Sequence, residues 1–156
     1  MIEAEVLVES KNWKKIIQNP KQRIKKILKR LPHPYKFPNQ KVFITVLLTD
    51  NNKIKLLNEK FRKKNKPTDI LSFPFFDKKN FKKNSKYTKF YLGDIVISDG
   101  EFKKKNLNDF KNGFIKIFIH GFLHLLNFDH KSDKDFKRMN SIENKIFQNV
   151  KGKFEI

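Results

Sequence analysis

Two kinds of hydrophobic spacing alternate along the chain and predict strands and helices in turn. Short runs rich in apolar or β-branched side chains predict four strands, over residues 3–8, 41–49, 69–76 and 92–98. Apolar residues at intervals of three and four predict helices over 20–31, after Asp50, over 110–126 and after Ser132. Pro74 places the third strand at a sheet edge or at a strand end, because proline donates no ladder hydrogen bond.

The order of these elements favours one α+β domain over residues 1–156. Ser98, with Glu101 three residues later, has the spacing of a capping box and predicts a further helix after the fourth strand. Residues 110–126 are apolar on nearly every side after Asn112, as in a buried central helix. We therefore expect a mixed sheet of about four strands with about five helices.

Residues 77–90 are mostly polar and rich in lysine, and we expect a basic, mobile loop there. Aromatic rings among lysines suit single-stranded RNA, because bases stack on rings while ammonium groups follow phosphates. The candidates for RNA binding are Lys82, Lys83, Lys86 and Tyr87. A solvated loop without a ligand is the alternative.

The chain is strongly basic, with 36 Lys and Arg against 16 Asp and Glu and a formal net charge of +20. This charge favours a polyanionic partner, either nucleic acid or an anionic membrane surface. All but four of the basic residues are lysine, so coding bias is a second explanation. The absence of cysteine excludes disulfides and thiolate chemistry. Without a signal peptide or a membrane span, a cytoplasmic protein is expected.

Three of the four histidines lie within HGFLHLLNFDH, residues 120–130. His120 and His124 are one helical turn apart and project from the same face. If Asn127 adopts the left-handed conformation that ends many helices, the chain turns back and returns His130 to the same point. Three imidazoles with one position left for water describe a catalytic zinc site. Histidines that merely cluster are the alternative.

The spacing matches the metzincin peptidase pattern H-E-x-x-H-x-x-G-x-x-H except at two positions. Asn127 stands at the glycine position, and Gly121 stands where a peptidase has its catalytic glutamate. The metal-binding half of the pattern is present without the base, which disfavours a metallopeptidase. A glycine inside a helix leaves room for substrate or for a closely packed neighbour.

Three segments together resemble the YbeY endoribonucleases, bacterial rRNA maturation factors. HGFLHLLNFDH resembles the family's H-G-x-L-H-L-x-G-[YF]-D-H. NEKFRKKNKPTDILSFPF resembles its N-x-x-[FY]-R-x-x-x-x-P-T-D-V-L-S-F-P block, and LGDIVIS resembles its L-G-D-I-[VA]-I-[SC] strand. The match runs from about residue 40 to 150, whereas the first forty residues match only in outline.

The resemblance implies one Zn²⁺ held by His120, His124 and His130 on a zincin-like helix. It implies hydrolysis of single-stranded RNA, processing of the 16S rRNA 3′ end and a role in ribosome quality control with the small subunit. The family's functionally important arginine maps to Arg62, so Arg62 and His120 are the catalytic candidates.

The residue chemistry is compatible with this assignment. The planar guanidinium of Arg62 can bind a phosphodiester through two hydrogen bonds, and a lysine ammonium cannot supply this geometry. Asp69 and Asp129 are candidates to orient a metal-bound imidazole, or else turn residues. No residue is an evident general base. A non-catalytic ribosome-binding factor with a structural zinc is the alternative function.

Overall fold

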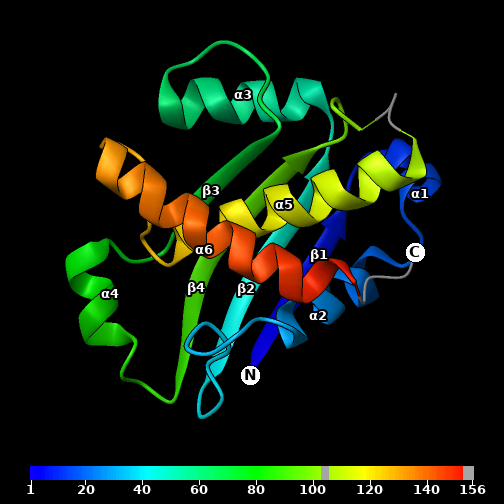
Figure 1. Ribbon diagram of the computed structural model, residues 1–156. Coiled ribbons are helices and arrows are strands. Elements are labelled where there is room, and N and C mark those ends of the chain that lie inside the picture. The colour runs from blue at the N-terminus through cyan, green and yellow to red at the C-terminus, as the bar shows by residue number, and fades with distance from the viewer. Residues whose placement is uncertain (103–105, 153–156) are drawn as a thin grey trace.

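The computed structural model describes residues 1–102 and 106–152, with a four-stranded sheet between helices on both faces (Figure 1). The sheet order is β1 (Ile2–Val8), β2 (Lys41–Thr49), β4 (Lys89–Ser98) and β3 (Ile70–Pro74). β1, β2 and β4 are parallel, and β3 runs antiparallel to β4. The mixed sheet is confirmed, and the strand that ends in Pro74 lies at an edge as predicted.

In the described part of the chain there are six helices, four between successive strands and two after β4. They are α1 (Lys11–Ile16), α2 (Pro20–Lys29), α3 (Asn51–Arg62), α4 (Lys78–Asn84), α5 (Leu107–Leu125) and α6 (Asp133–Lys151). Helices α2, α5 and α6 contribute to the main core, and α6 lies beside α5 (Figure 1). α3 packs on the opposite face, where Ile54 meets Leu71 and Val96.

α5 is the buried central helix that its sequence predicted. Phe114, Phe118 and Phe122 have no exposed surface and pack in the main core. Burying a phenylalanine contributes roughly 1.5–3 kcal/mol relative to leaving it exposed, so this helix is held firmly against the sheet. His120 and His124 lie in the last two turns of α5. Packing of the helix against the core therefore fixes the backbone positions of these two histidines.

Two predictions need correction, and a third lies partly outside the described residues. Residues 78–84 form α4 rather than a loop, because Asp77 caps the helix and Phe81 packs against the main core. The six-residue α1 was not predicted, since one and a half turns give little periodicity. The helix expected after Ser98 is a turn over 100–102, and residues 103–105 are not among those described.

Among the described residues we find no helix with the length and apolar run needed to cross a lipid bilayer.

Candidate metal centre

The end of α5 brings three histidines to one point. His120 and His124 lie one turn apart on the helix, which ends at Leu125. Asn127 has a positive φ of 64°, the left-handed conformation that the sequence predicted for it. The turn at this residue reverses the chain and places His130 against the other two. One ring nitrogen from each histidine lies within 4.8 Å of the other two, a spacing suited to a single metal ion.

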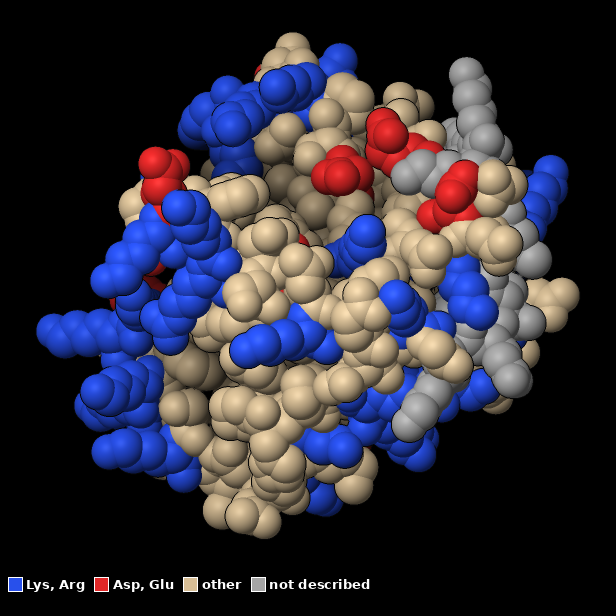
Figure 2. All heavy atoms as spheres, viewed as in Figure 1, with Lys and Arg blue, Asp and Glu red and all other residues tan. Residues whose placement is uncertain are grey.

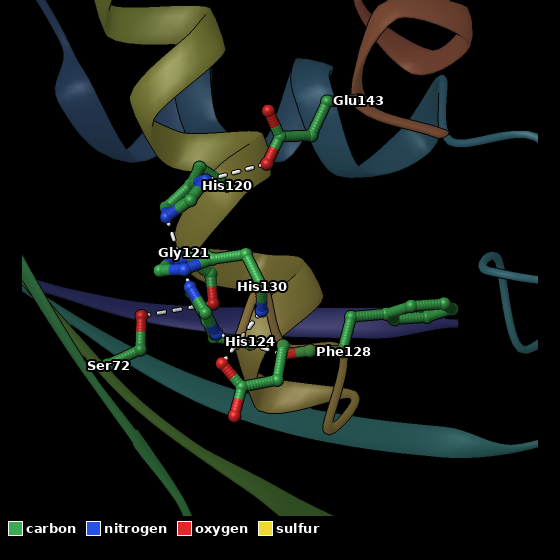
Figure 3. A network of polar contacts seen from close by, with 8 residues as sticks. Ser72, His120, Gly121, His124, Phe128, His130 and Glu143 are labelled. Carbon is green, nitrogen blue, oxygen red and sulfur yellow. Dashed lines mark hydrogen bonds and ion pairs between the residues drawn. The ribbon is translucent and has the colours of Figure 1, made fainter. Parts of the chain in front are cut away.

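The outer nitrogen of each helical histidine is already hydrogen-bonded (Figure 3). His120 Nδ1 lies 2.6 Å from Oε1 of Glu143, and His124 Nδ1 lies 2.9 Å from the carbonyl oxygen of Phe128. Both partners are acceptors, so each Nδ1 carries the proton and each Nε2 keeps its lone pair.

The two free nitrogens face each other at a distance that fits a shared metal ion. His120 Nε2 and His124 Nε2 are 3.0 Å apart. Two nitrogen ligands about 2.0–2.1 Å from one tetrahedral zinc ion lie about 3.3 Å apart. Two lone pairs at this range repel each other unless a cation or a proton lies between them. The donor set and its orientation therefore fit a divalent metal.

His124 is further prepared for metal binding by its electrostatic surroundings. Burial, together with the neighbouring His120 and His130, lowers the pKa of His124 below its ordinary value. The imidazole therefore stays neutral at a pH where an ordinary histidine has begun to protonate. Only the neutral ring has the lone pair that binds a metal.

A cavity of about 460 Å³ opens beside the histidines and contains Arg62 in its wall. Arg62 ends α3, and its guanidinium donates a hydrogen bond to the carbonyl oxygen of Ser72 at 3.0 Å. This bond uses one of five guanidinium donors and leaves the others for a ligand. The structure thus brings a planar cation to the same cavity as the histidines.

Gly121 faces the sheet rather than the cavity. A Cβ at this position would lie 2.5 Å from Ile70 Cδ1 and 3.0 Å from Ser72 Oγ. The Ser72 hydroxyl also donates a hydrogen bond to the Gly121 carbonyl oxygen at 3.1 Å (Figure 3). A glycine here was expected to leave room either for substrate or for a closely packed neighbour. The structure shows the neighbour, which is strand β3. A glutamate side chain has no space here.

Asp69 and Asp129, the two candidates to orient an imidazole or else to serve as turn residues, make other hydrogen bonds. The Asp69 carboxylate accepts from the Thr68 hydroxyl at 3.4 Å, and the Asp129 carboxylate accepts from the backbone N–H of His130 at 2.8 Å. Within the described residues, neither carboxylate hydrogen-bonds to a histidine ring. Both residues nevertheless line the cavity.

Glu143 is the carboxylate that orients a helical histidine, through its contact with His120 Nδ1. The signal was available, because Glu143 follows the buried Met139 by one helical turn and precedes the buried Ile146 by three residues. A carboxylate beside the apolar stripe of a helix needs a partner. Which partner it meets depends on how α6 packs against α5, and no local pattern reveals that.

The RNA-binding candidates lie on or near α4. Lys82 and Lys83 are exposed on this helix, and Lys86 and Tyr87 are exposed in the turn that follows. Among the described residues that line the histidine cavity, none of the four occurs. Any contact they make with RNA is therefore outside the metal centre.

Comparison with known proteins agrees with this geometry. The family model described as "Endoribonuclease YbeY" matches residues 7–151. A relative from Pelagibacter ubique named "Endoribonuclease YbeY" is 50% identical over 98% of this chain and 99% of its own. One from Persephonella marina with the same name is 40% identical over 72% of this chain and 73% of its own.

A solved structure has a similar fold. The solution structure of a Thermotoga maritima protein is 29% identical, with a TM-score of 0.55, over 97% of this chain and 90% of that chain. The family model spans nearly the whole chain, and the histidine motif that carried the resemblance lies inside it. On these matches, the chain belongs to the YbeY endoribonuclease family.

Proposed function

We propose that this chain is a zinc-dependent endoribonuclease that cuts single-stranded RNA. The observation that carries the proposal is the shared cavity, in which three converging histidines and the Arg62 guanidinium line one space of about 460 Å³. A phosphodiester is an anion whose charge grows in the transition state, so it matches a metal with an adjacent planar cation. Membership of the YbeY family supports RNA as the substrate.

In this proposal His120, His124 and His130 hold one Zn²⁺. When bound, zinc makes water acidic enough to act as a nucleophile near neutral pH and polarises a phosphoryl oxygen. Glu143 and the Phe128 carbonyl keep His120 and His124 in the tautomer that binds metal. Arg62 binds the phosphate and, held by Ser72, does so from a fixed direction.

We assign the activity to rRNA maturation, at the 3′ end of 16S rRNA, and to ribosome quality control in the cytoplasm. The family match supports this role. The small ribosomal subunit is the partner it implies, and the net charge of +20 favours binding to such a polyanion.

A gel assay on a short single-stranded RNA tests the proposal, with wild type compared with His124→Ala and Arg62→Lys. We expect wild type to cut, His124→Ala to lose activity with its metal, and Arg62→Lys to bind metal but cut at least 100-fold more slowly, as when one transition-state donor is removed. Equal cleavage by all three proteins overturns the proposal, because the activity then belongs to a contaminant. Zinc binding and subunit binding without cleavage favour a ribosome-binding factor.

A further inference from the structure

A basic notch lies next to the metal cavity, between α4 and α6. Its volume is about 280 Å³, close to the lower end of the range for small-ligand pockets, which begins at about 300 Å³. The turn over residues 127–129 forms a wall of both the notch and the histidine cavity. A chain molecule bound at the metal therefore reaches the notch by crossing this one turn.

Three cations and two aromatic rings line the notch. Lys78 and Lys82 come from α4, and Arg138 comes from α6. Phe81, Phe128 and Leu126 supply its apolar surface. This is the combination that binds a nucleotide of single-stranded nucleic acid, with cations for phosphate and rings for the base.

Two carboxylates also line the notch, but they do not cancel its charge. Asp129 accepts a hydrogen bond from His130 and lies 3.4 Å from the Lys131 ammonium, so its charge is already partnered. Asp135 lies in the first turn of α6, where a carboxylate is stabilised by the helix dipole. The notch therefore has three positive charges and two negative ones, and its net charge is positive.

Arg138 is linked to the metal centre through a single residue. Its guanidinium carbon lies 5.5 Å from the centre of the Phe128 ring, within range of a cation–π contact. The carbonyl oxygen of the same Phe128 accepts the hydrogen bond from His124. The residue that orients a metal-facing histidine thus also holds Arg138 at the notch.

Among the described residues, the opposite side of the metal centre is mainly acidic. A second cavity of about 400 Å³ adjoins His120, and its described lining includes Asp69, Glu101, Glu143 and Lys116. Figure 2 shows basic side chains gathered over α3 and α4, and acidic side chains in the region between α3 and α5. An RNA backbone is attracted to the basic side chains over α3 and α4.

Resting on the endoribonuclease function proposed above, we propose that the notch between α4 and α6 is a subsite for a nucleotide next to the scissile phosphate. Arg138 and the two lysines bind its phosphate, and Phe81 and Phe128 contact its base. The substrate therefore passes from the end of α3, across the histidines, to α4, and avoids the acidic cavity.

Equilibrium binding tests this subsite separately from cleavage. The probe is a labelled 2′-O-methylated single-stranded hexanucleotide, titrated with the zinc-loaded full chain at several salt concentrations. Arg138→Ala should weaken binding about tenfold and reduce the slope of log K against log salt by about 0.7, the value for one phosphate contact on a single strand. Arg138→Lys should restore the slope but only part of the affinity, because lysine keeps the charge without the planar stack.

Lys145→Ala is the matched control, since it removes one exposed charge from the same helix away from the notch. It should leave both affinity and slope unchanged, and zinc content should be equal in all variants. Wild-type binding by Arg138→Ala, or an equal loss in Lys145→Ala, overturns the subsite. A third outcome is that the wild-type chain cuts no RNA but its RNA binding depends on Arg138. That result supports the notch as a nucleotide-binding site and overturns the endoribonuclease function instead.

Discussion

At the scale of single residues, the orientation of two imidazole rings decides the chemistry of the site. His120 and His124 each have two ring nitrogens, and a helix alone does not choose between them. Glu143 binds Nδ1 of the first and the Phe128 carbonyl binds Nδ1 of the second, so both Nε2 atoms turn inward. Outer partners of this kind raise the basicity of metal-bound histidines as well as fixing their direction.

Glu143→Gln should lower zinc affinity by about 10- to 100-fold, because an amide is a weaker acceptor than a carboxylate and leaves His120 less basic. Competition with a chromophoric chelator measures this affinity. Glu101→Gln removes the same charge from the neighbouring acidic cavity, and Glu101 has no hydrogen bond to a histidine among the described residues. Equal losses in the two variants would mean that net charge, and not the bond to His120, sets the affinity.

At the scale of secondary-structure elements, the distance between α5 and the β3 edge of the sheet depends on Gly121. Helix and strand approach closely where this residue has no side chain, and the Ser72 hydroxyl joins them there. The same strand holds Arg62 through its backbone carbonyl at Ser72. A shift between α5 and β3 would therefore move Arg62 relative to the histidines.

Gly121→Ala should destabilise the fold by about 1–3 kcal/mol through overpacking against Ile70, partly offset by about 1 kcal/mol of helix propensity. Its RNA cleavage should fall more than its zinc affinity, because both helical histidines stay on α5 while Arg62 is displaced. Denaturant unfolding, zinc titration and the gel assay measure the three quantities. Gly152→Ala, where an added Cβ meets no atom of the described residues within 4 Å, is the control and should change stability by less than about 0.5 kcal/mol. Unchanged stability and cleavage in Gly121→Ala would show that the contact is not tight.

At the scale of the whole molecule, the core and the metal centre are separate. The main core is built from apolar side chains of the sheet, α1, α2, α5 and α6. His120 and His124 are half-buried at its rim, and His130 is exposed. A metal that binds such a rim adds to stability without being required for folding.

Removing the metal with a chelator should therefore leave the protein folded, with near-ultraviolet circular dichroism intact and cooperative unfolding. The free energy of unfolding should fall by about 2.7 kcal/mol relative to protein with free zinc at 100 times its dissociation constant. Structural zinc domains behave differently, since they unfold without metal. Loss of tertiary structure on chelation would support the ribosome-binding factor with structural zinc.

Several features follow from the sequence because they depend on local physical chemistry. Short apolar or β-branched runs predicted the four strands, and a segment apolar on nearly every side predicted the buried helix α5. Pro74 placed its strand at an edge by its missing N–H, and Asn127 ended α5 because asparagine tolerates positive φ. The turn at Asn127 in turn made the convergence of three histidines predictable. Helix α4 was not predicted because its capping aspartate and one half-buried phenylalanine are a weak signal among lysines.

Only the tertiary structure decided which groups from distant segments meet at the site. Glu143 reaches His120 across 23 positions because α6 packs beside α5, and Gly121 faces β3 because that edge strand runs under the helix. Asp69 and Asp129 were reasonable candidates by sequence position, but side-chain direction depends on packing that no local pattern contains. The sequence by itself thus determined the metal-binding motif and the sheet, whereas packing between elements determined the partners, the cavity and the charge on each side of it.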